Sequence, residues 1–183
     1  MRGESRVKWL LERLSTLALI ISGLFLFAMM IHVAADVALK YAINKPIPGT
    51  LEVVSTYYMV AGVFLPIAAV EMTRQSISVD VAYQFMPRGM QVFSMVLALS
   101  GSAAVYFMLA YTGFGDAMKS WRINEQLMGQ VAVIVWPSRL ALPIGFFLAG
   151  LVCVWQLHGF LTSAQIRERL LALHDVEEEP THG

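Results

Sequence analysis

The sequence predicts an all-α integral membrane protein with four transmembrane helices, short interfacial helices and both termini in the cytoplasm. Two observations predict this class. Hydrophobic residues make up 57% of the 183-residue chain and charged residues only 14%, against about 25% charged residues in soluble domains. Four apolar runs are also long enough to cross a hydrocarbon core of about 30 Å. We place these spans at about residues 14–35, 51–73, 92–114 and 137–160.

The charge balance of the chain points away from nucleic acid. Thirteen basic and thirteen acidic side chains cancel, so the chain has no net charge that would attract a polyanion. The single cysteine, Cys153, lies in an apolar run and excludes a disulfide within the chain. We therefore interpret Cys153 as a small buried hydrophobic residue.

The first span follows a basic, amphipathic lead-in at residues 1–13. A basic start and an apolar run also describe a secretory signal peptide. The apolar part of a signal peptide, however, is about 7–15 residues long. The uncharged run here extends from Leu14 to Ala35 and is about 22 residues long. We therefore interpret it as a retained first span.

The second span follows a turn at residues 44–49, which is rich in proline and ends in glycine. Thr50 is a plausible N-cap for the helix that begins there. Glu52 then lies in the first turn, where the positive end of the helix dipole favours a carboxylate. Pro66 lies inside the span, and we expect it to kink the helix.

The connections around the third span contain amphipathic segments. Asp80 could cap a short helix over residues 81–86 that lies in the plane of the interface. Small residues at 100–104 indicate a packing face inside the third span, because small side chains let helix backbones approach closely in lipid. Residues 116–130 mix apolar and charged side chains, which favours a second interfacial helix or a re-entrant loop. Trp121 in this segment fits the headgroup level.

The fourth span begins near Trp136. Pro143 cannot donate a hydrogen bond to the carbonyl of Arg139, so we expect a bend in this helix. Gly145 and Ala149 lie four residues apart and form a pair of small residues, which indicates a second packing face.

The chain divides into a membrane domain, residues 1–162, and a cytoplasmic segment, residues 163–183. That segment begins as an amphipathic helix and ends in an acidic tail that we expect to be disordered. Four spans put both termini on one side, which carries eight Lys and Arg residues against four on the other. Because cytoplasmic loops carry the excess of Lys and Arg, the count predicts cytoplasmic termini.

Glu52 and Arg139 are the first candidates for a functional pair. Each lies a turn or less inside a helix that starts at the outer surface, so we expect both at similar depth. An ionisable side chain in a membrane helix seeks a partner, and we hypothesise that these two pair near the outer interface. The alternative is that each side chain reaches water separately.

The histidines allow a test of a haem-binding interpretation. Haem in a membrane bundle is ligated by two histidines on different helices. His32 is near the outer end of the first span and His158 near the inner end of the fourth, so they cannot share one iron. His174 and His182 lie in the tail.

The chain also has no glycine-rich phosphate loop, zinc-protease motif or nucleophile elbow. We therefore expect no cofactor, no metal site and no enzymatic activity.

Several short motifs follow one another at characteristic spacing. They are Lys40-Tyr41, Pro46-x-Pro48-Gly49-Thr50-x-Glu52, Ile77-x-Val79-Asp80 followed by Pro87, and Trp136-Pro137-Ser138-Arg139 continuing to Pro143-Ile-Gly145-Phe. Together they resemble the DctQ-type small membrane subunit of tripartite ATP-independent periplasmic (TRAP) transporters, over about residues 14–160. One departure is Ser76, since members of this family often carry a histidine before the isoleucine.

The resemblance implies a role and partners. Such small subunits work with a large multi-span membrane subunit, which carries the substrate and ion sites, and with a periplasmic substrate-binding protein. Transport is secondary, driven by an ion gradient, and takes organic acids across the bacterial inner membrane. The small subunit would be a scaffold that also contributes to docking of the binding protein. Two other classes are a haem-bearing or other electron-transfer membrane anchor and a self-sufficient small transporter.

The resemblance also suggests where the candidate residues act. Glu52 and Arg139 would tie the second and fourth spans together near the periplasmic face. The cytoplasmic turn, or a contact with the large subunit, would use Glu71, Arg74 and Asp80. The periplasmic surface would be presented by the segment that contains Trp121 and Arg122. For Arg74 and Arg122, simple anchoring to lipid headgroups is an equally good interpretation.

Overall fold

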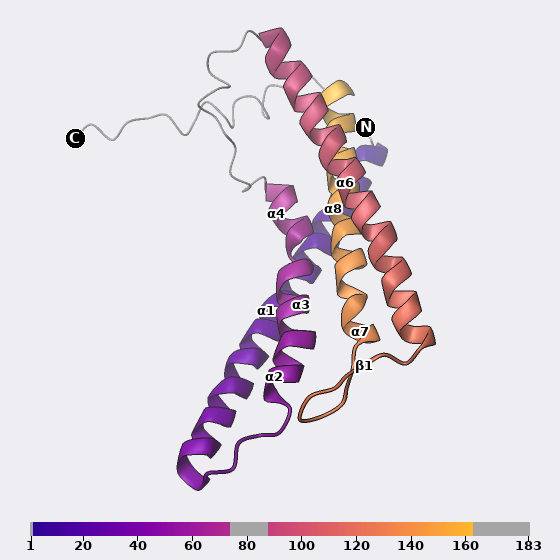
Figure 1. Cartoon of the computed structure of the whole chain (residues 1–183). Coiled ribbons are helices and arrows are strands. Elements are labelled where there is room, and N and C mark those ends of the chain that lie inside the picture. Colours follow the sequence, from indigo (N-terminus) through magenta and orange to yellow (C-terminus); the bar gives the residue numbers. More distant parts are fainter. Residues whose placement is uncertain (1, 74–87, 163–183) are drawn as a thin grey trace, which may run out of the picture.

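Four long helical segments run alternately up and down in the computed structural model, which describes residues 2–73 and 88–162 (Figure 1). The first is α1 (Arg2–Ile43). The second is composed of α2 (Thr50–Val53), η1 (Val54–Tyr58), α3 (Met59–Phe64) and α4 (Ile67–Thr73). The third is α6 (Arg88–Arg122), and the fourth comprises α7 (Trp136–Arg139) and α8 (Ala141–Thr162).

All four segments are long and apolar enough to cross a membrane, which confirms the predicted all-α four-span fold. The membrane-compatible stretches are Arg6–Ile43, Thr50–Met72, Gly89–Arg122 and Trp136–Thr162. Among the described residues, a small departure from the all-α fold is a hairpin of two strands, β1 (Gln126–Leu127) and β2 (Val133–Ile134), which pair antiparallel. The first residues of α1 and the last residues of α8 lie at the same end of the bundle (Figure 1).

Two of the helices extend well beyond the predicted spans. The amphipathic lead-in is continuous with the first span, so α1 has 42 residues and is about 63 Å long. Asn44 ends this helix in the left-handed conformation, with φ 55°, which asparagine tolerates better than most residues. Helix α6 likewise continues to Arg122. The predicted interfacial helix or re-entrant loop at 116–130 is therefore wrong, because its first half continues α6 and its second half enters the hairpin.

Pro66 breaks the second segment, as the sequence predicts, and a side chain from another helix repairs the break. Helix α3 ends at Phe64 and α4 begins at Ile67. Since Pro66 has no N–H, the carbonyl of Gly62, four residues earlier, loses its helical donor. The hydroxyl of Ser22 on α1 donates to that carbonyl at 2.9 Å. Ser22 is only 2% exposed, so water has little access to this hydrogen bond.

The fourth segment is interrupted where Pro143 removes a donor. Helix α7 ends at Arg139, whose carbonyl would have accepted from residue 143. Leu140 is a turn residue, and α8 begins at Ala141. The predicted bend is thus present as a break three residues before the proline.

The core of the bundle lies between α6, α8 and the second segment. Phe160 of α8 packs against Met95 and Leu99 of α6. Gly145 of α8 approaches the backbone of α3 so closely that a Cβ there would lie 1.9 Å from the carbonyl oxygen of Phe64. Ala149, one turn on, is fully buried, so the predicted packing face at residues 145 and 149 is confirmed.

The small residues at 100–104 form a less continuous face than the sequence suggests. Ala103 is buried, but Ser100 is exposed. A Cβ on Gly101 would meet no atom within 4 Å. This stretch of α6 therefore turns only part of its small-residue surface towards the rest of the described chain.

Replacing Ser22 by alanine should destabilise the bundle by leaving the Gly62 carbonyl without a donor in an apolar setting. We expect a loss of about 1 kcal/mol in the free energy of unfolding, measured by detergent-induced unfolding of the purified chain. Ser100→Ala is the matched control, because the Ser100 hydroxyl bonds locally to the carbonyl of Leu97 on an exposed face. In a Pro66→Ala background the Gly62 carbonyl regains its helical donor, so Ser22→Ala should cost less there. An equal cost in both backgrounds would show that the repair is not the source of the effect.

Candidate functional site

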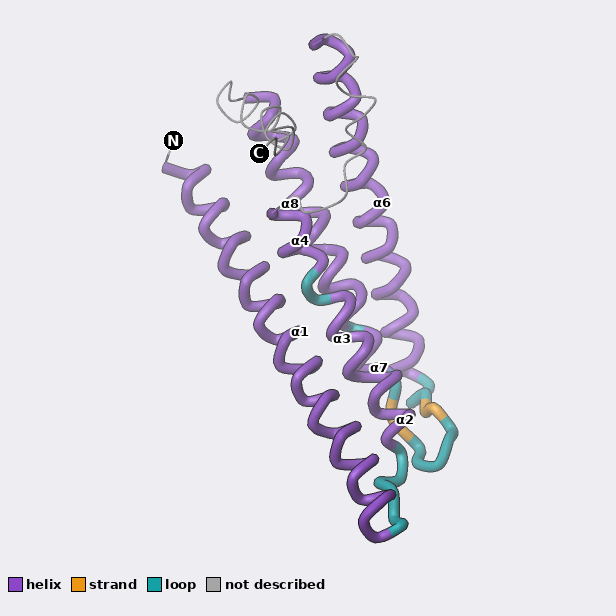
Figure 2. The backbone as a smooth tube through the Cα atoms, turned by 90° about the vertical axis from the view of Figure 1, so that its left-hand side faces the viewer, coloured by secondary structure: helices purple, strands orange, loops and turns teal. Residues whose placement is uncertain are grey.

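A group of polar contacts between distant parts of the chain lies at one end of the bundle, which we call the hairpin end. It consists of the turn at residues 44–49, the start of the second segment, and the connection at residues 123–135 that contains β1 and β2. Figure 2 shows the hairpin beside α2 and α7. The hydroxyl of Tyr57 in η1 donates to the carbonyl of Ile134 in β2 at 2.5 Å. The hairpin is thus attached to the second segment.

Glu52 anchors the tip of the hairpin. It lies in the first turn of α2, is 9% exposed, and its Oε1 accepts the backbone N–H of Gln130 at 2.5 Å. A carboxylate that accepts a backbone N–H forms a charge-assisted bond, which is stronger than a neutral one. The hairpin tip is therefore held by a buried carboxylate of the second segment.

Glycine is required at the tip because the Glu52 carboxylate occupies the adjacent space. A Cβ on Gly129 would lie 1.9 Å from Oε1 of Glu52. A second close approach occurs at Gly49, whose φ of 83° is in the left-handed region and whose Cβ would lie 3.0 Å from Val131. The turn before the second segment and the hairpin thus pack directly on each other.

The turn at residues 44–49 is held by an acid and a hydroxyl. Asp36 of α1 accepts the backbone N–H of Ile47 on Oδ1 at 2.6 Å. Thr50, predicted as the N-cap, is instead the first helical residue, and its hydroxyl donates to the carbonyl of Ile47 at 3.1 Å. The N-cap position belongs to Gly49. The helix therefore begins one residue earlier than predicted, because Gly49 adopts the left-handed conformation at the N-cap.

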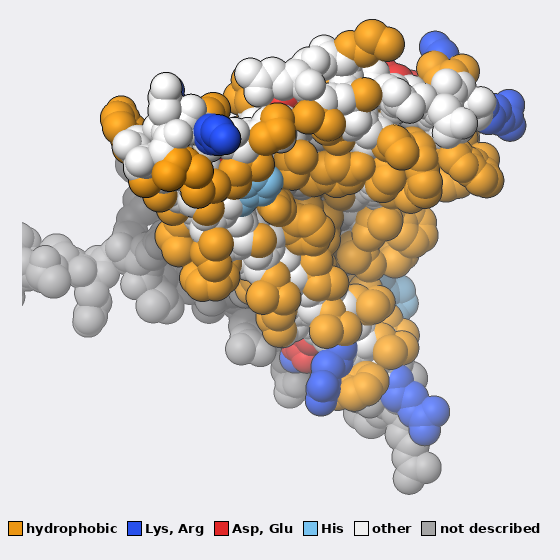
Figure 3. Space-filling view, turned by 90° about the horizontal axis from the view of Figure 1, so that it is seen from below, with side chains coloured by type: hydrophobic (Ala, Val, Ile, Leu, Met, Phe, Trp, Pro, Cys, Tyr) orange, Lys and Arg blue, Asp and Glu red, His pale blue; other side chains and the backbone are white. Residues whose placement is uncertain are grey.

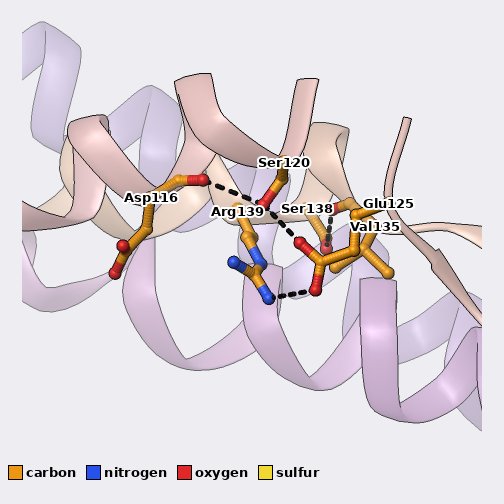
Figure 4. Close-up of polar contacts among 6 residues, drawn as sticks. All are labelled: Asp116, Ser120, Glu125, Val135, Ser138 and Arg139. Atoms are coloured by element: carbon orange, nitrogen blue, oxygen red, sulfur yellow. Dashed lines mark hydrogen bonds and ion pairs between the residues drawn. The ribbon is translucent and has the colours of Figure 1, made fainter. Parts of the chain in front are cut away.

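Arg139 pairs with Glu125 (Figure 4), and the hypothesised pair with Glu52 is wrong. Nη2 of Arg139 donates to Oε1 of Glu125 at 2.8 Å. The fully buried Ser120 hydroxyl lies 2.6 Å from Oε2 of Glu125 and 2.8 Å from the carbonyl of Asp116. Its one hydrogen can serve one of these two acceptors at a time. Glu52 and Arg139 do both contact the same 123–135 connection, each through its own partner.

Glu125 is the site residue that the sequence interpretation missed. Asn124 adopts the left-handed conformation, with φ 47°, and the N–H of Glu125 turns back to the carbonyl of Ser120 at 3.0 Å. An asparagine after the last turn of a helix is a known termination signal. That signal at Asn124 could have shown that α6 ends there and that the next side chain folds back.

The other predicted residues lie elsewhere. Glu71 is in α4, towards the opposite end of the bundle, where its Oε2 accepts from the hydroxyl of Tyr106 at 3.2 Å and its carbonyl accepts from Gln156 at 3.0 Å. Arg74 and Asp80, together with the predicted helix at 81–86, lie outside the described residues.

Trp121 and Arg122 form the exposed end of α6. The ring of Trp121 lies 6.3 Å from that of Trp136, centroid to centroid, and Arg122 is exposed. Paired tryptophans at a helix end are typical of the membrane interface.

The two histidines in the described residues lie towards different ends of the bundle. The Nδ1 of His32 lies 3.3 Å from the hydroxyl of Tyr58, whereas His158 is in the last turns of α8, near the other end of the bundle. Within residues 2–73 and 88–162, the structure brings together no group of three or more His, Cys, Asp or Glu side chains that could hold a metal ion. What this end of the bundle offers is positioning, with carboxylates that hold backbone and guanidinium groups.

Comparison with protein families gave a match over most of the chain. Residues 29–162 match the family described as tripartite ATP-independent periplasmic transporters, DctQ component. A search of curated proteins and a search of solved structures each returned no match.

Gly129→Ala should displace the hairpin tip, since the added methyl group would overlap the Glu52 carboxylate. We expect faster proteolytic cleavage between residues 123 and 135 and a loss of about 1–3 kcal/mol in the free energy of unfolding. Gly115→Ala is the control, because a Cβ there meets no atom within 4 Å.

The double variant Glu52→Ala/Gly129→Ala separates this explanation from a general effect of removing glycine. Without the carboxylate the methyl group has room, so the second substitution should cost less than it does alone. Strictly additive losses would contradict the contact between these residues.

Proposed function

Since the chain belongs to the DctQ family, the small membrane component of TRAP transporters, we propose that it acts as a scaffold for the transporter's large membrane subunit. It is an inner-membrane protein with four spanning helices. In this proposal the large subunit carries the substrate and ion sites, and a periplasmic binding protein delivers an organic acid. An ion gradient drives the uptake.

The exposed apolar surface of α1 supports a scaffolding role. Leu24 is 62% exposed and Phe27 58% exposed near the middle of this helix. From below, hydrophobic side chains make up most of the coloured surface (Figure 3). A large apolar face in a membrane protein contacts lipid or another membrane protein. For a component of a tripartite transporter, the second partner is the natural one.

The uncharged interiors of the spans support the proposal that another subunit carries the transport path. The stretches 14–35, 53–70, 89–115 and 140–162 contain no Asp, Glu, Lys or Arg. Proton and ion pathways in transporters use ionisable groups inside the membrane. Glu71, near the end of its segment, is bonded to Tyr106. A path for a coupling ion would therefore have to come from the partner.

We further propose that both termini are cytoplasmic and that the hairpin end faces the periplasm. The excess of Lys and Arg on the terminal side supports this orientation. The hairpin end would then be the surface available to the binding protein, with Arg122 and Trp121 at its margin. Glu52 and Arg139 would keep that surface in shape by holding the 123–135 connection.

Reconstitution into liposomes tests the proposal. The tagged chain should co-purify with a large membrane subunit. Uptake of the organic acid along an imposed sodium gradient should require both membrane subunits and the binding protein.

In the same assay, Arg122→Glu should lower uptake several-fold without loss of the large subunit, whereas Arg13→Glu, at the other end of the bundle, should have little effect.

Three results would contradict parts of this function. Gradient-driven uptake by the chain alone would make it a self-sufficient transporter. A Soret band in the purified protein would favour an electron-transfer anchor. Unchanged uptake and binding-protein association in Arg122→Glu would remove the docking role of that residue.

A further inference from the structure

A cleft of about 530 Å³ opens between the second segment, α6 and the start of the fourth segment. Its rim at the hairpin end carries Asp116, Arg139 and the hydroxyl of Ser55. Its deeper wall is apolar and includes Val60 and Leu142. The volume is in the range of small-molecule sites, and a mainly apolar wall with a few polar groups is typical of them.

The rim of the cleft lies just inside the level of the paired tryptophans. Tryptophans are enriched at membrane interfaces, so we take the adjacent rings of Trp121 and Trp136 to mark the level of the interface. Arg139 follows Trp136 by three residues and Asp116 precedes Trp121 by five, which corresponds to about 4.5 Å and about 7.5 Å along a helix axis. The two charged side chains therefore lie where lipid headgroups meet the hydrocarbon, and the apolar wall continues towards the acyl chains.

The charges at the rim have both signs. Arg139 uses Nη2 for Glu125 and retains further N–H groups, since a guanidinium has five. In the part of the chain that the structure describes, the Asp116 carboxylate makes no hydrogen bond or ion pair, and Figure 4 shows it directed away from the Ser120–Glu125 cluster. Arg139 is already paired with Glu125, so the formal charges of Asp116, Glu125 and Arg139 leave this part of the cleft with one net negative charge.

We propose that this cleft binds a zwitterionic phospholipid with a primary ammonium headgroup, of the phosphatidylethanolamine class. The ammonium donates to the Asp116 carboxylate, and the phosphate accepts from Arg139. The glycerol region and the first part of an acyl chain lie against Val60 and Leu142. The proposal does not rest on the transport role, although Arg139 also holds the 123–135 connection through Glu125.

The charge balance selects this occupant over three others. A free organic anion or an anionic lipid would meet a rim that is already net negative. A trimethylammonium headgroup has no N–H to donate to Asp116, although it has the same charge. A primary ammonium provides three donors, so a preference for ethanolamine over choline is the signature of the contact.

Native mass spectrometry of the full-length chain tests the site, both alone and co-purified with its large subunit. The protein is equilibrated with equal amounts of phosphatidylethanolamine, phosphatidylcholine and phosphatidylglycerol, and retained lipid is counted. We expect one retained phosphatidylethanolamine in both preparations. Asp116→Asn should lower its preference over phosphatidylcholine by about tenfold, the effect of losing one charge-assisted hydrogen bond. Glu12→Gln, which removes a carboxylate near the start of α1 at the opposite end of the bundle, should leave the preference unchanged.

Several outcomes would overturn the proposal. They are equal retention of the three lipids, an Asp116→Asn variant that elutes as folded protein with unaltered preference, and loss of the lipid when the large subunit is present. The last result would assign the cleft to the subunit interface. Displacement of the lipid by millimolar succinate, but not by glycerophosphoethanolamine, would assign it to a transported acid.

Discussion

The hydrogen bond from Ser22 to the carbonyl of Gly62 expresses the constraint on which the fold depends, that every backbone polar group inside the bilayer must find a partner within the protein. Hydrocarbon offers no donor or acceptor, so a proline in a span requires compensation. Pro66 removes one helical donor, and a buried serine on α1 replaces it at 2.9 Å. The same bond attaches α1, which is otherwise largely exposed, to the rest of the bundle. One hydrogen bond thus both replaces the donor that Pro66 lacks and joins α1 to the second segment.

The second consequence of this constraint is the concentration of charge at the ends. The spans are uncharged inside, and the irregular backbone at residues 44–49 and 123–135 lies where the helices end. There, Asp36 and Glu52 accept backbone N–H groups of the connections, and Glu125 accepts from Arg139. At the hairpin end of the bundle, carboxylates hold backbone N–H groups and the Arg139 side chain in place. That use of charge is what a positioning subunit requires.

Some of this structure could be predicted from the sequence and some could not. Length and the absence of charge defined four spans, and Pro66 and Pro143 marked the breaks in two of them, because these are local properties. The partner of Arg139 was missed because it depends on a reversal at Asn124 that brings a loop residue back to a helix. The hairpin was missed because two-residue strands have too little pattern to recognise. The π-helical turn at Val54–Tyr58 has no sequence signal that we can identify.

The scaffolding account depends most directly on what covers the exposed face of α1. A photo-crosslinking amino acid at Leu24, which is 62% exposed, can be activated in membranes that contain the assembled transporter. The account predicts a crosslink to the large membrane subunit, and a much weaker one from Ser22, which is turned towards Gly62. Crosslinks from Leu24 to lipid alone, in membranes where the two subunits co-purify, would contradict it.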